Sequence, residues 1–294
     1  MKLNHNSELL KNTDSAVLAA LKKEPKTLIS KLIVITIIVS MLVWSASAII
    51  YTGINENGLN IVVNILKFFI WPDSNPNKPV LMSYLFTLKT SGIPYLMYET
   101  LMIAFMGTLL GAIISIPFAF LSSKNMTGKV GSFIGSFIIA LIRTIPIFVW
   151  GIIFIRVKGG PLAGVLAIAV SSVGMISKLY IEAIEDIDKG ILEALDSTGA
   201  TILQKIRFGI MPQLTATFLS TAIYRFEINV KNATILGMVG AGGIGFTLLD
   251  ALGSFNFGIV AVCLWAIIPV VFIIEYFSTK IRTKLTTGEF QVQG

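Results

Sequence analysis

Six stretches of this 294-residue chain are apolar over about the length that crosses a lipid bilayer. A membrane-spanning helix needs about 20 mostly apolar residues, and soluble domains carry about 25% charged residues. Here only 13% of residues are charged and the mean hydropathy is +0.82. The sequence therefore predicts an all-α, polytopic membrane helical bundle of about six transmembrane helices. The predicted spans are Leu32–Tyr51, Thr100–Leu121, Val130–Ile155, Gly159–Ser177, Gln213–Leu249 and Asn256–Ile274.

Lysine and arginine are unevenly divided between the two sides that six spans define. One side holds 15 of them, and the other holds five. Cytoplasmic loops carry the excess of these residues, so we expect both termini in the cytoplasm and the chain in the cytoplasmic (cell) membrane, surrounded by lipid. The same rule explains the net charge of +7 without nucleic acid as a partner. The predicted parts are a cytoplasmic tail (1–30), a first membrane helix with an external connection (31–94), a core transmembrane domain (95–280) containing a cytoplasmic loop (178–212), and a cytoplasmic C-terminal tail (281–294).

The external connection contains a short apolar segment, Ile61–Trp71, that ends in an aromatic cluster. Such a segment can lie along the membrane interface. It can equally be a short helix packed against the rest of the protein. The residues that follow, Asp73–Pro79, predict a polar turn.

Several kinds of chemistry lack the residues they need. The chain has one histidine, His5, in a polar tail, and one cysteine, Cys263, in an apolar run. We therefore expect no metal site, no catalytic residues and no cofactor. The run Gly240–Gly245 fits the pattern G-x-G-x-x-G, but its flanks are predicted spans and no acid lies between Asp250 and Glu275, so a dinucleotide site is not expected.

The predicted cytoplasmic loop begins with an amphipathic pattern. Apolar residues recur every three or four positions, which predicts one stripe along a helix, and acidic residues fill the intervening face. The pattern suits docking to a soluble partner, with apolar side chains entering a groove, and it suits equally a helix that lies on its own protein. The stripe consists of Ile181, Ile184, Ile187, Ile191 and Leu195.

The same loop resembles the EAA loop of ABC importer permeases. That family has Glu-Ala-Ala, then a glycine, then Ile-x-Leu-Pro; here Leu195 replaces the second alanine, Gly209 the isoleucine and Met211 the leucine. The resemblance implies a type I ABC importer permease fold, ATP hydrolysis on separate ABC ATPase subunits, an extracellular or periplasmic substrate-binding protein and a second permease copy. It also implies coupling to the ATPase through the residues that match, which are Glu193, Ala194, Gly199 and Pro212.

Two further stretches, Leu141–Pro146 and Phe226–Gly245, are similar to phosphonate/phosphite-type permeases. Lys231 stands where that subfamily has arginine. The resemblance implies import of phosphonate or a related phosphorus oxyanion. Methionine-type permeases share a similar glycine-rich segment, so a methionine- or betaine-type permease is the alternative. A stand-alone carrier or channel would need no coupling loop.

Charges and glycines inside the predicted spans are candidates for the pathway or its gate. An ionisable residue within a span is expensive and faces protein or water. Glu227 is expected either to pair with Arg143, Arg225 or Lys231 and lock helices together, or to accompany a cationic lining for an oxyanion. The glycines either let helices pack closely or break a helix beside the pathway. The candidates are Arg143, Pro146, Arg225, Glu227, Asn229, Lys231, Gly240, Gly242 and Gly243.

Overall fold

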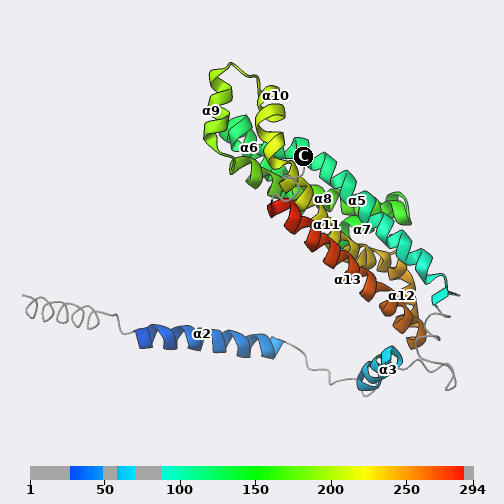
Figure 1. The fold of residues 1–294 in the computed structure, drawn as a ribbon. Coiled ribbons are helices and arrows are strands. Elements are labelled where there is room, and N and C mark those ends of the chain that lie inside the picture. Colours follow the sequence, from blue (N-terminus) through cyan, green and yellow to red (C-terminus); the bar gives the residue numbers. More distant parts are fainter. Residues whose placement is uncertain (1–26, 49–57, 71–87, 90, 288–294) are drawn as a thin grey trace, which may run out of the picture. The chain divides into compact units, whose positions relative to one another are not determined.

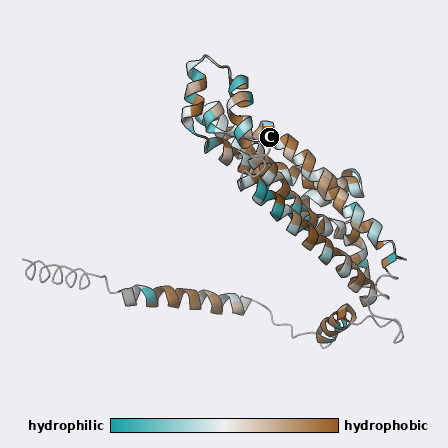
Figure 2. Cartoon of the chain, in the orientation of Figure 1, coloured by the Kyte–Doolittle hydropathy of each residue, from teal (hydrophilic) through white to brown (hydrophobic). Residues whose placement is uncertain are grey.

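The computed structural model describes residues 27–48, 58–70, 88–89 and 91–287, and the chain forms two compact units, residues 1–59 and 60–294. The first unit contains helix α2 (Thr27–Ala48, Figure 1), which is mostly apolar after a hydrophilic band near its start (Figure 2). The predicted cytoplasmic tail up to residue 26, with His5, and the predicted turn Asp73–Pro79 lie outside the described residues.

The regular secondary structure among the described residues of the second unit is all helical, and its helices form an elongated bundle (Figure 1). Its helices are α3 (Gly58–Ile70), α5 (Ile93–Ser122), α6 (Lys124–Thr144), α7 (Ile147–Val157), α8 (Pro161–Glu185), α9 (Lys189–Ser197), α10 (Ile202–Gln204), the π-helix η1 (Lys205–Ile210), α11 (Met211–Met238), α12 (Ile244–Gly253) and α13 (Phe257–Thr287).

Helices α5 and α8 form the centre of the bundle. They approach closely because small residues line their contact, as is common between helices in lipid. A Cβ atom added at Gly107 would lie 2.6 Å from Ile168, and one added at Gly111 would lie 2.6 Å from Ser172. Helix α11 packs against this pair, so that side chains of α5, α8 and α11 meet in the interior.

Five described helices are long and apolar enough to cross a membrane: α2, α5, α6, α8 and α13. Large apolar side chains point outward from them, for example Phe272 at 68% exposure, as expected of a lipid-facing surface. The predicted all-α polytopic class is confirmed. Helix α11 has 28 residues but carries Arg225, Glu227 and Lys231, so its crossing of the membrane as a sixth span stays a prediction.

Two predicted spans are interrupted. The prediction of a continuous helix over Val130–Ile155 is wrong, because the chain leaves the helix at Ile145 and Pro146 between α6 and α7. Proline lacks an amide hydrogen and disfavours a helical residue before it. The stretch Gln213–Leu249 is likewise divided between α11 and α12. Gly151 of α7 lies against Leu236 of α11, so the two interrupted helices pack on each other near their breaks.

Helix α3 packs against the start of α13 through aromatic rings. Phe68 lies 6.1 Å from Phe257 between ring centroids, and Phe69 stacks on Trp265 at 5.5 Å. The indole N–H of Trp265 donates to the carbonyl oxygen of Phe69 at 3.0 Å. That carbonyl belongs to the last turn of α3, where helical partners are missing. The contact supports the reading of this segment as a packed helix, while its placement along a membrane interface stays a prediction.

Candidate functional site

The loop between α8 and α11 folds as a helical hairpin, residues 189–210, at one end of the bundle (Figure 1). Helix α8 ends at Glu185, and α9 starts after Asp188, whose carboxylate accepts from the amide of Gly190 at 2.9 Å. The prediction of one continuous amphipathic helix is therefore wrong. A residue such as Asp188 in this position satisfies an amide that has no partner inside the helix.

The predicted apolar stripe packs mainly inward. Ile181, Ile184 and Ile187 are 4%, 0% and 7% exposed, and they share a core cluster with Ile210 and Leu214. The reading in which these side chains enter a groove on a partner is wrong for them, because they hold the base of the hairpin to its own protein.

Gly199 turns the hairpin. Its φ is +73°, the amide of Ala200 donates to the carbonyl of Leu195, and the amide of Gly199 donates to that of Asp196. This pattern is a Schellman motif, which favours glycine because a Cβ atom is disfavoured at positive φ. Thr201 then caps the next limb, accepting through its hydroxyl while its amide donates to the side chain of Gln204 at 2.8 Å.

Leu195 and Gly209, which both depart from the family pattern, lie against each other across the hairpin. A Cβ atom added at Gly209 would lie 2.6 Å from Leu195. The larger residue at position 195 thus occupies space that the smaller residue at position 209 leaves open. An ion pair between Asp196 and Lys205 also joins the two limbs.

The outward surface of the hairpin combines charge with exposed apolar side chains. Glu193 and Ala194 are exposed on α9, and Pro212 is exposed in the first turn of α11. Ile202, Leu203 and Phe208 are 57%, 78% and 66% exposed. These three were missed by the sequence analysis, although the adjoining Thr201–Gln204 capping box was a readable signal that a second helical limb begins there.

A polar cluster lies in the interior of the bundle. Arg225 of α11 is 7% exposed and donates from Nη2 to the hydroxyl of Ser171 at 3.0 Å and from Nε to the hydroxyl of Ser172 at 3.4 Å. Its Nη1 lies 3.0 Å from the sulfur of Met175. All three partners belong to one turn of α8. The contacts fix the guanidinium between α8 and α11.

Asn229 extends the polar cluster to α5. It is 0% exposed, and its amide nitrogen lies 2.8 Å from the hydroxyls of both Thr108 and Ser172. Thr108 stands at the middle of the 30-residue helix α5. Buried polar groups require such partners, because an unpaired one costs about 1–3 kcal/mol. The cluster therefore joins α5, α8 and α11 at mid-height.

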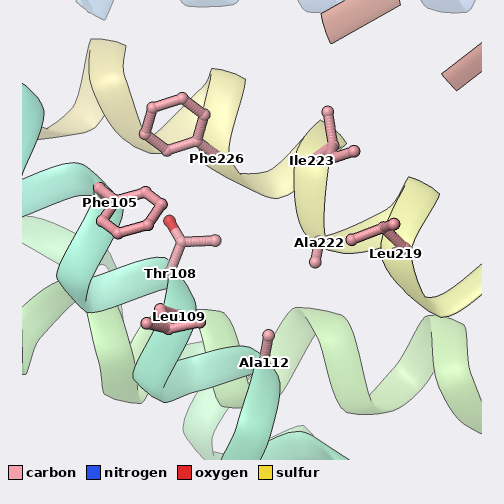
Figure 3. A pocket seen from close by; sticks show the side chains of 8 residues that line it. All are labelled: Phe105, Thr108, Leu109, Ala112, Leu219, Ala222, Ile223 and Phe226. Atoms are coloured by element: carbon pink, nitrogen blue, oxygen red, sulfur yellow. The ribbon is translucent and has the colours of Figure 1, made fainter. Parts of the chain in front are cut away.

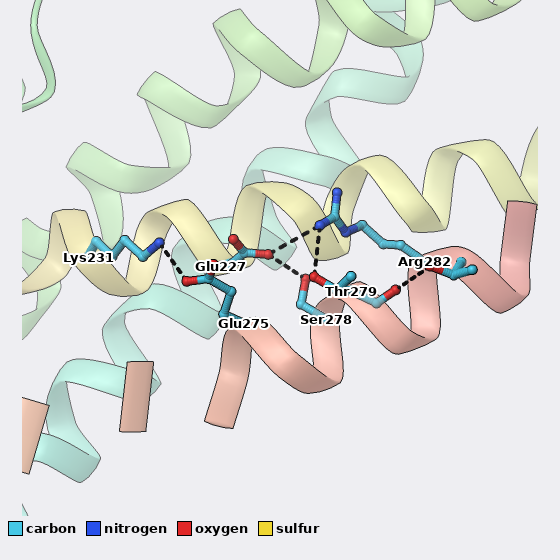
Figure 4. Close-up of polar contacts among 7 residues, drawn as sticks. Glu227, Lys231, Glu275, Ser278, Thr279 and Arg282 are labelled. Atoms are coloured by element: carbon cyan, nitrogen blue, oxygen red, sulfur yellow. Dashed lines mark hydrogen bonds and ion pairs between the residues drawn. The ribbon is translucent and has the colours of Figure 1, made fainter. Parts of the chain in front are cut away.

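Two ion pairs connect α11 with α13 (Figure 4). Glu227 accepts from the hydroxyl of Ser278 at 2.8 Å and lies 3.5 Å from Nη2 of Arg282, while Lys231 lies 3.2 Å from Glu275. The expectation that Glu227 pairs with Arg143, Arg225 or Lys231 is wrong. The acid turns to the opposite face of α11 from Arg225, where α13 supplies its partner.

Arg143 and Pro146 lie at the break between α6 and α7. The Arg143 side chain is exposed and crosses Gly174 of α8, where an added Cβ atom would lie 2.8 Å from its Cγ. Gly174 belongs to the same turn of α8 that contacts Arg225. The structure thus brings both arginines to one turn of α8, while the described residues include no ion-pair partner for Arg143.

The glycine-rich segment ends α11 and starts α12. Gly240, Gly242 and Gly243 have φ of +95°, +84° and +78°, which confirms a break in the helix. The segment is also closely packed: Gly242 lies against Pro161, where an added Cβ atom would be 2.9 Å away, and the amide of Ile244 donates to the hydroxyl of Thr100 at 2.9 Å. Both expectations for these glycines are met in part, and a role in lining a pathway stays a proposal.

A groove of about 210 Å³ lies between α5 and α11. Figure 3 shows apolar side chains of both helices around it, with the hydroxyl of Thr108 as the polar group in its lining. Since Thr108 also accepts from Asn229, the groove reaches the interior polar cluster. Among the described residues no group of three or more His, Cys, Asp or Glu is arranged to hold a metal ion.

A bundle whose polar side chains gather at its centre, with helices interrupted beside them, is typical of a polytopic membrane transport protein. The sequence model of the binding-protein-dependent transport system inner membrane components matches residues 107–286. That is more than half of the chain, and the chain belongs to this family.

Relatives with known names extend this assignment. The chain is 37% identical to the phosphite transport system permease protein PtxC of Stutzerimonas stutzeri, over 63% of this chain and 68% of that protein. It is 40% identical to the phosphate-import permease protein PhnE of Mycolicibacterium smegmatis, over 54% of this chain and 30% of that protein. It is 41% identical to a putative cryptic phosphonate transport system permease protein of Escherichia coli, over 40% of this chain and 96% of that protein.

Solved structures agree on the fold. The inward-facing MetNI methionine ABC transporter has a chain that matches with a TM-score of 0.57 and 24% identity, over 66% of this chain and 95% of its own. An amino acid ABC transporter with histidines matches with a TM-score of 0.56 and 20% identity, over 71% and 100%. The predicted type I ABC importer permease fold is confirmed.

Proposed function

We propose that this chain is the membrane permease subunit of an ATP-driven importer of phosphorus oxyanions. It moves the solute and has no catalytic role, while a separate ABC ATPase hydrolyses ATP and a substrate-binding protein delivers the solute. Named relatives that import phosphite, phosphate or act in phosphonate transport support the substrate class.

The observation that carries the ATP-driven reading is the hairpin. It is rigid, because a Schellman turn, a capping box and an ion pair hold it. It nevertheless exposes Glu193, Leu203 and Phe208 to its surroundings. A rigid projection with exposed apolar anchors suits docking into a partner's groove. The ATPase is the partner we assign to it, with Glu193, Ala194, Gly199 and Pro212 in the coupling segment.

The proposed arrangement places the hairpin and both termini in the cytoplasm and pairs this chain with a second copy of itself. The positive-inside distribution supports the orientation. A motion of the hairpin would then tilt α11, which directly continues the limb that ends at Ile210, and α8, which a short turn over residues 186–188 joins to the other limb, and would change access to the interior polar cluster. The helix breaks at Pro146 and at Gly240–Gly243 are the proposed gate elements.

The test is copurification of the solubilised chain with the ATPase. We expect Phe208→Ser and Glu193→Lys to weaken ATPase binding by about tenfold or more, as is usual for anchors at an interface. Phe246→Ser is the matched control, because Phe246 is 59% exposed at the other end of the bundle. An intact wild-type chain that binds no ATPase would exclude the proposal and favour a stand-alone carrier or channel.

A further inference from the structure

Arg225 has no carboxylate partner among the described residues, whereas Lys231 of α11 and Arg282 of α13 each pair with an acid. Helices α11 and α13 each contain one acid, and both acids are engaged: Glu227 with Ser278 and Arg282, and Glu275 with Lys231. Among the described residues no carboxylate contacts Arg225. Its partners are two hydroxyls and a thioether, although it is 7% exposed.

Burial without a counter-charge is costly for a guanidinium, which stays protonated in proteins. Neutral hydroxyls compensate only part of the lost hydration, and a thioether sulfur is a weak acceptor. A structure that keeps such a cation in its interior gains the missing stabilisation when an anion arrives. The Lys231 and Arg282 pairs do not create this demand, because each is already neutralised by an acid.

We propose that Arg225, together with the hydroxyls of Ser171 and Ser172, forms a station for one tetrahedral oxyanion at mid-height of the bundle. The proposal rests on the proposed function for the identity of the anion, a phosphorus oxyanion. The guanidinium has five N–H donors, and its three named contacts use one each from Nε, Nη1 and Nη2. The remaining donors and the fork geometry suit two oxygens of such an anion.

The serines are arranged to donate. The Ser172 oxygen accepts from both Arg225 and Asn229, and the Ser171 oxygen accepts from Arg225. A hydroxyl that accepts through its oxygen keeps its own hydrogen for another acceptor. The Arg143 side chain crosses Gly174 on the same turn of α8, where an added Cβ atom would lie 2.8 Å from its Cγ. Asn229 anchors the serine and connects the station to the α5–α11 groove at Thr108.

Transport kinetics give the first test. The chain is reconstituted with its ATPase and binding protein, and ATP-driven uptake of inorganic phosphite is measured. We expect Arg225→Gln to lower kcat/KM by about tenfold or more, because a charge-assisted contact to the anion is lost. Arg225→Lys should recover part of the rate. The control is Lys280→Gln, which removes an exposed cation of α13 and should stay within about twofold.

Charge-selective labelling gives a readout that a structural role would not change. In a Cys263→Ala background, Ser171→Cys is exposed to an anionic and to a cationic methanethiosulfonate. We expect the anionic reagent to react faster, millimolar phosphite to protect the cysteine, and Arg225→Gln to abolish the preference. If the Arg225→Gln variant does not assemble, the test is whether millimolar phosphite protects the Ser171→Cys thiol in the chain that keeps Arg225.

The outcomes separate the station from the proposed function. No preference for the anionic reagent, or no reaction with either reagent in any state of the transport cycle, overturns the station. If the cysteine reacts faster with the anionic reagent but phosphite, phosphate and methylphosphonate do not protect it, the result supports the station and overturns the substrate class. If the wild-type chain binds no ATPase, the proposed importer is overturned, while the labelling result still tests the station independently.

Discussion

The turn at Gly199 allows a prediction that separates backbone conformation from side-chain size. Gly199 has φ +73°, and no atom lies within 4 Å of an added Cβ. Substitution here therefore changes the conformational preference of the turn without creating a collision. We predict that Gly199→Asn destabilises the hairpin least, Gly199→Ala more and Gly199→Val most, while membrane insertion is unchanged.

The magnitude follows from the positive φ. A residue with a Cβ atom loses about 1–2 kcal/mol in the left-handed region. Alanine recovers part of this because it restricts the unfolded chain, so its net cost is about 1 kcal/mol. Valine should lose about 2 kcal/mol or more, because β-branched residues are outliers at positive φ, whereas asparagine tolerates it. In an equilibrium that needs the native turn, these costs correspond to about fivefold for alanine and to about thirtyfold or more for valine.

The assay measures two quantities in proteoliposomes: the apparent affinity of the permease for its ATPase and the amount of solute moved per ATP hydrolysed. We expect both to fall in the order glycine, asparagine, alanine, valine. Normal transport by Gly199→Val would contradict the coupling role of the hairpin. An asparagine variant as impaired as the valine variant would contradict the conformational argument, because asparagine keeps the left-handed turn.

Three further substitutions test separate parts of the structure. Leu195→Ala should lower the stability of the hairpin by about 2–3 kcal/mol, and adding Gly209→Ile should restore much of that loss. Hydrogen exchange of the hairpin amides measures both changes. A double variant no more stable than Leu195→Ala alone would contradict the packing of positions 195 and 209 on each other. The swapped pair Lys231→Glu/Glu275→Lys should keep uptake within about twofold of the wild type if the pair is structural. Lys231→Glu alone places two acids together and should lower the melting temperature of the purified chain. Phe255→Gly should raise that melting temperature by relieving a φ of +56° at an exposed residue, a gain of about 1 kcal/mol, and a lowered value would show that the Phe255 ring contributes more than the strain costs.

Apolar length and charge were sufficient to predict the class of fold. Helix α5 contains one predicted span, and α8 and α13 each cover all but the first one or two residues of another, because a run of about 20 apolar residues has few alternatives in lipid. The breaks were harder to place. Pro146 was named as a candidate for the pathway or its gate, yet a continuous span was predicted through it, since the sequence is apolar on both sides of the kink. For the glycine segment the sequence left close packing and a helix break both open, and the break became evident only from the positive φ of Gly240, Gly242 and Gly243 in the structure.

The pairing of charges could not be predicted in the same way. Spacing along α11 places Glu227 and Lys231 one turn apart, which suggests a local pair, but their partners Arg282 and Glu275 come from α13, more than 40 positions later in the chain. Those contacts depend on the rotation of each helix about its axis, which tertiary packing sets. The consequence is functional as well as structural. Once α13 neutralises the other charges of α11, Arg225 remains on the inner face without a carboxylate partner among the described residues, and in the proposed station its positive charge lies where α8 supplies hydroxyls. The selectivity of the bundle for anions would then come from which charges are paired, more than from how many the sequence contains.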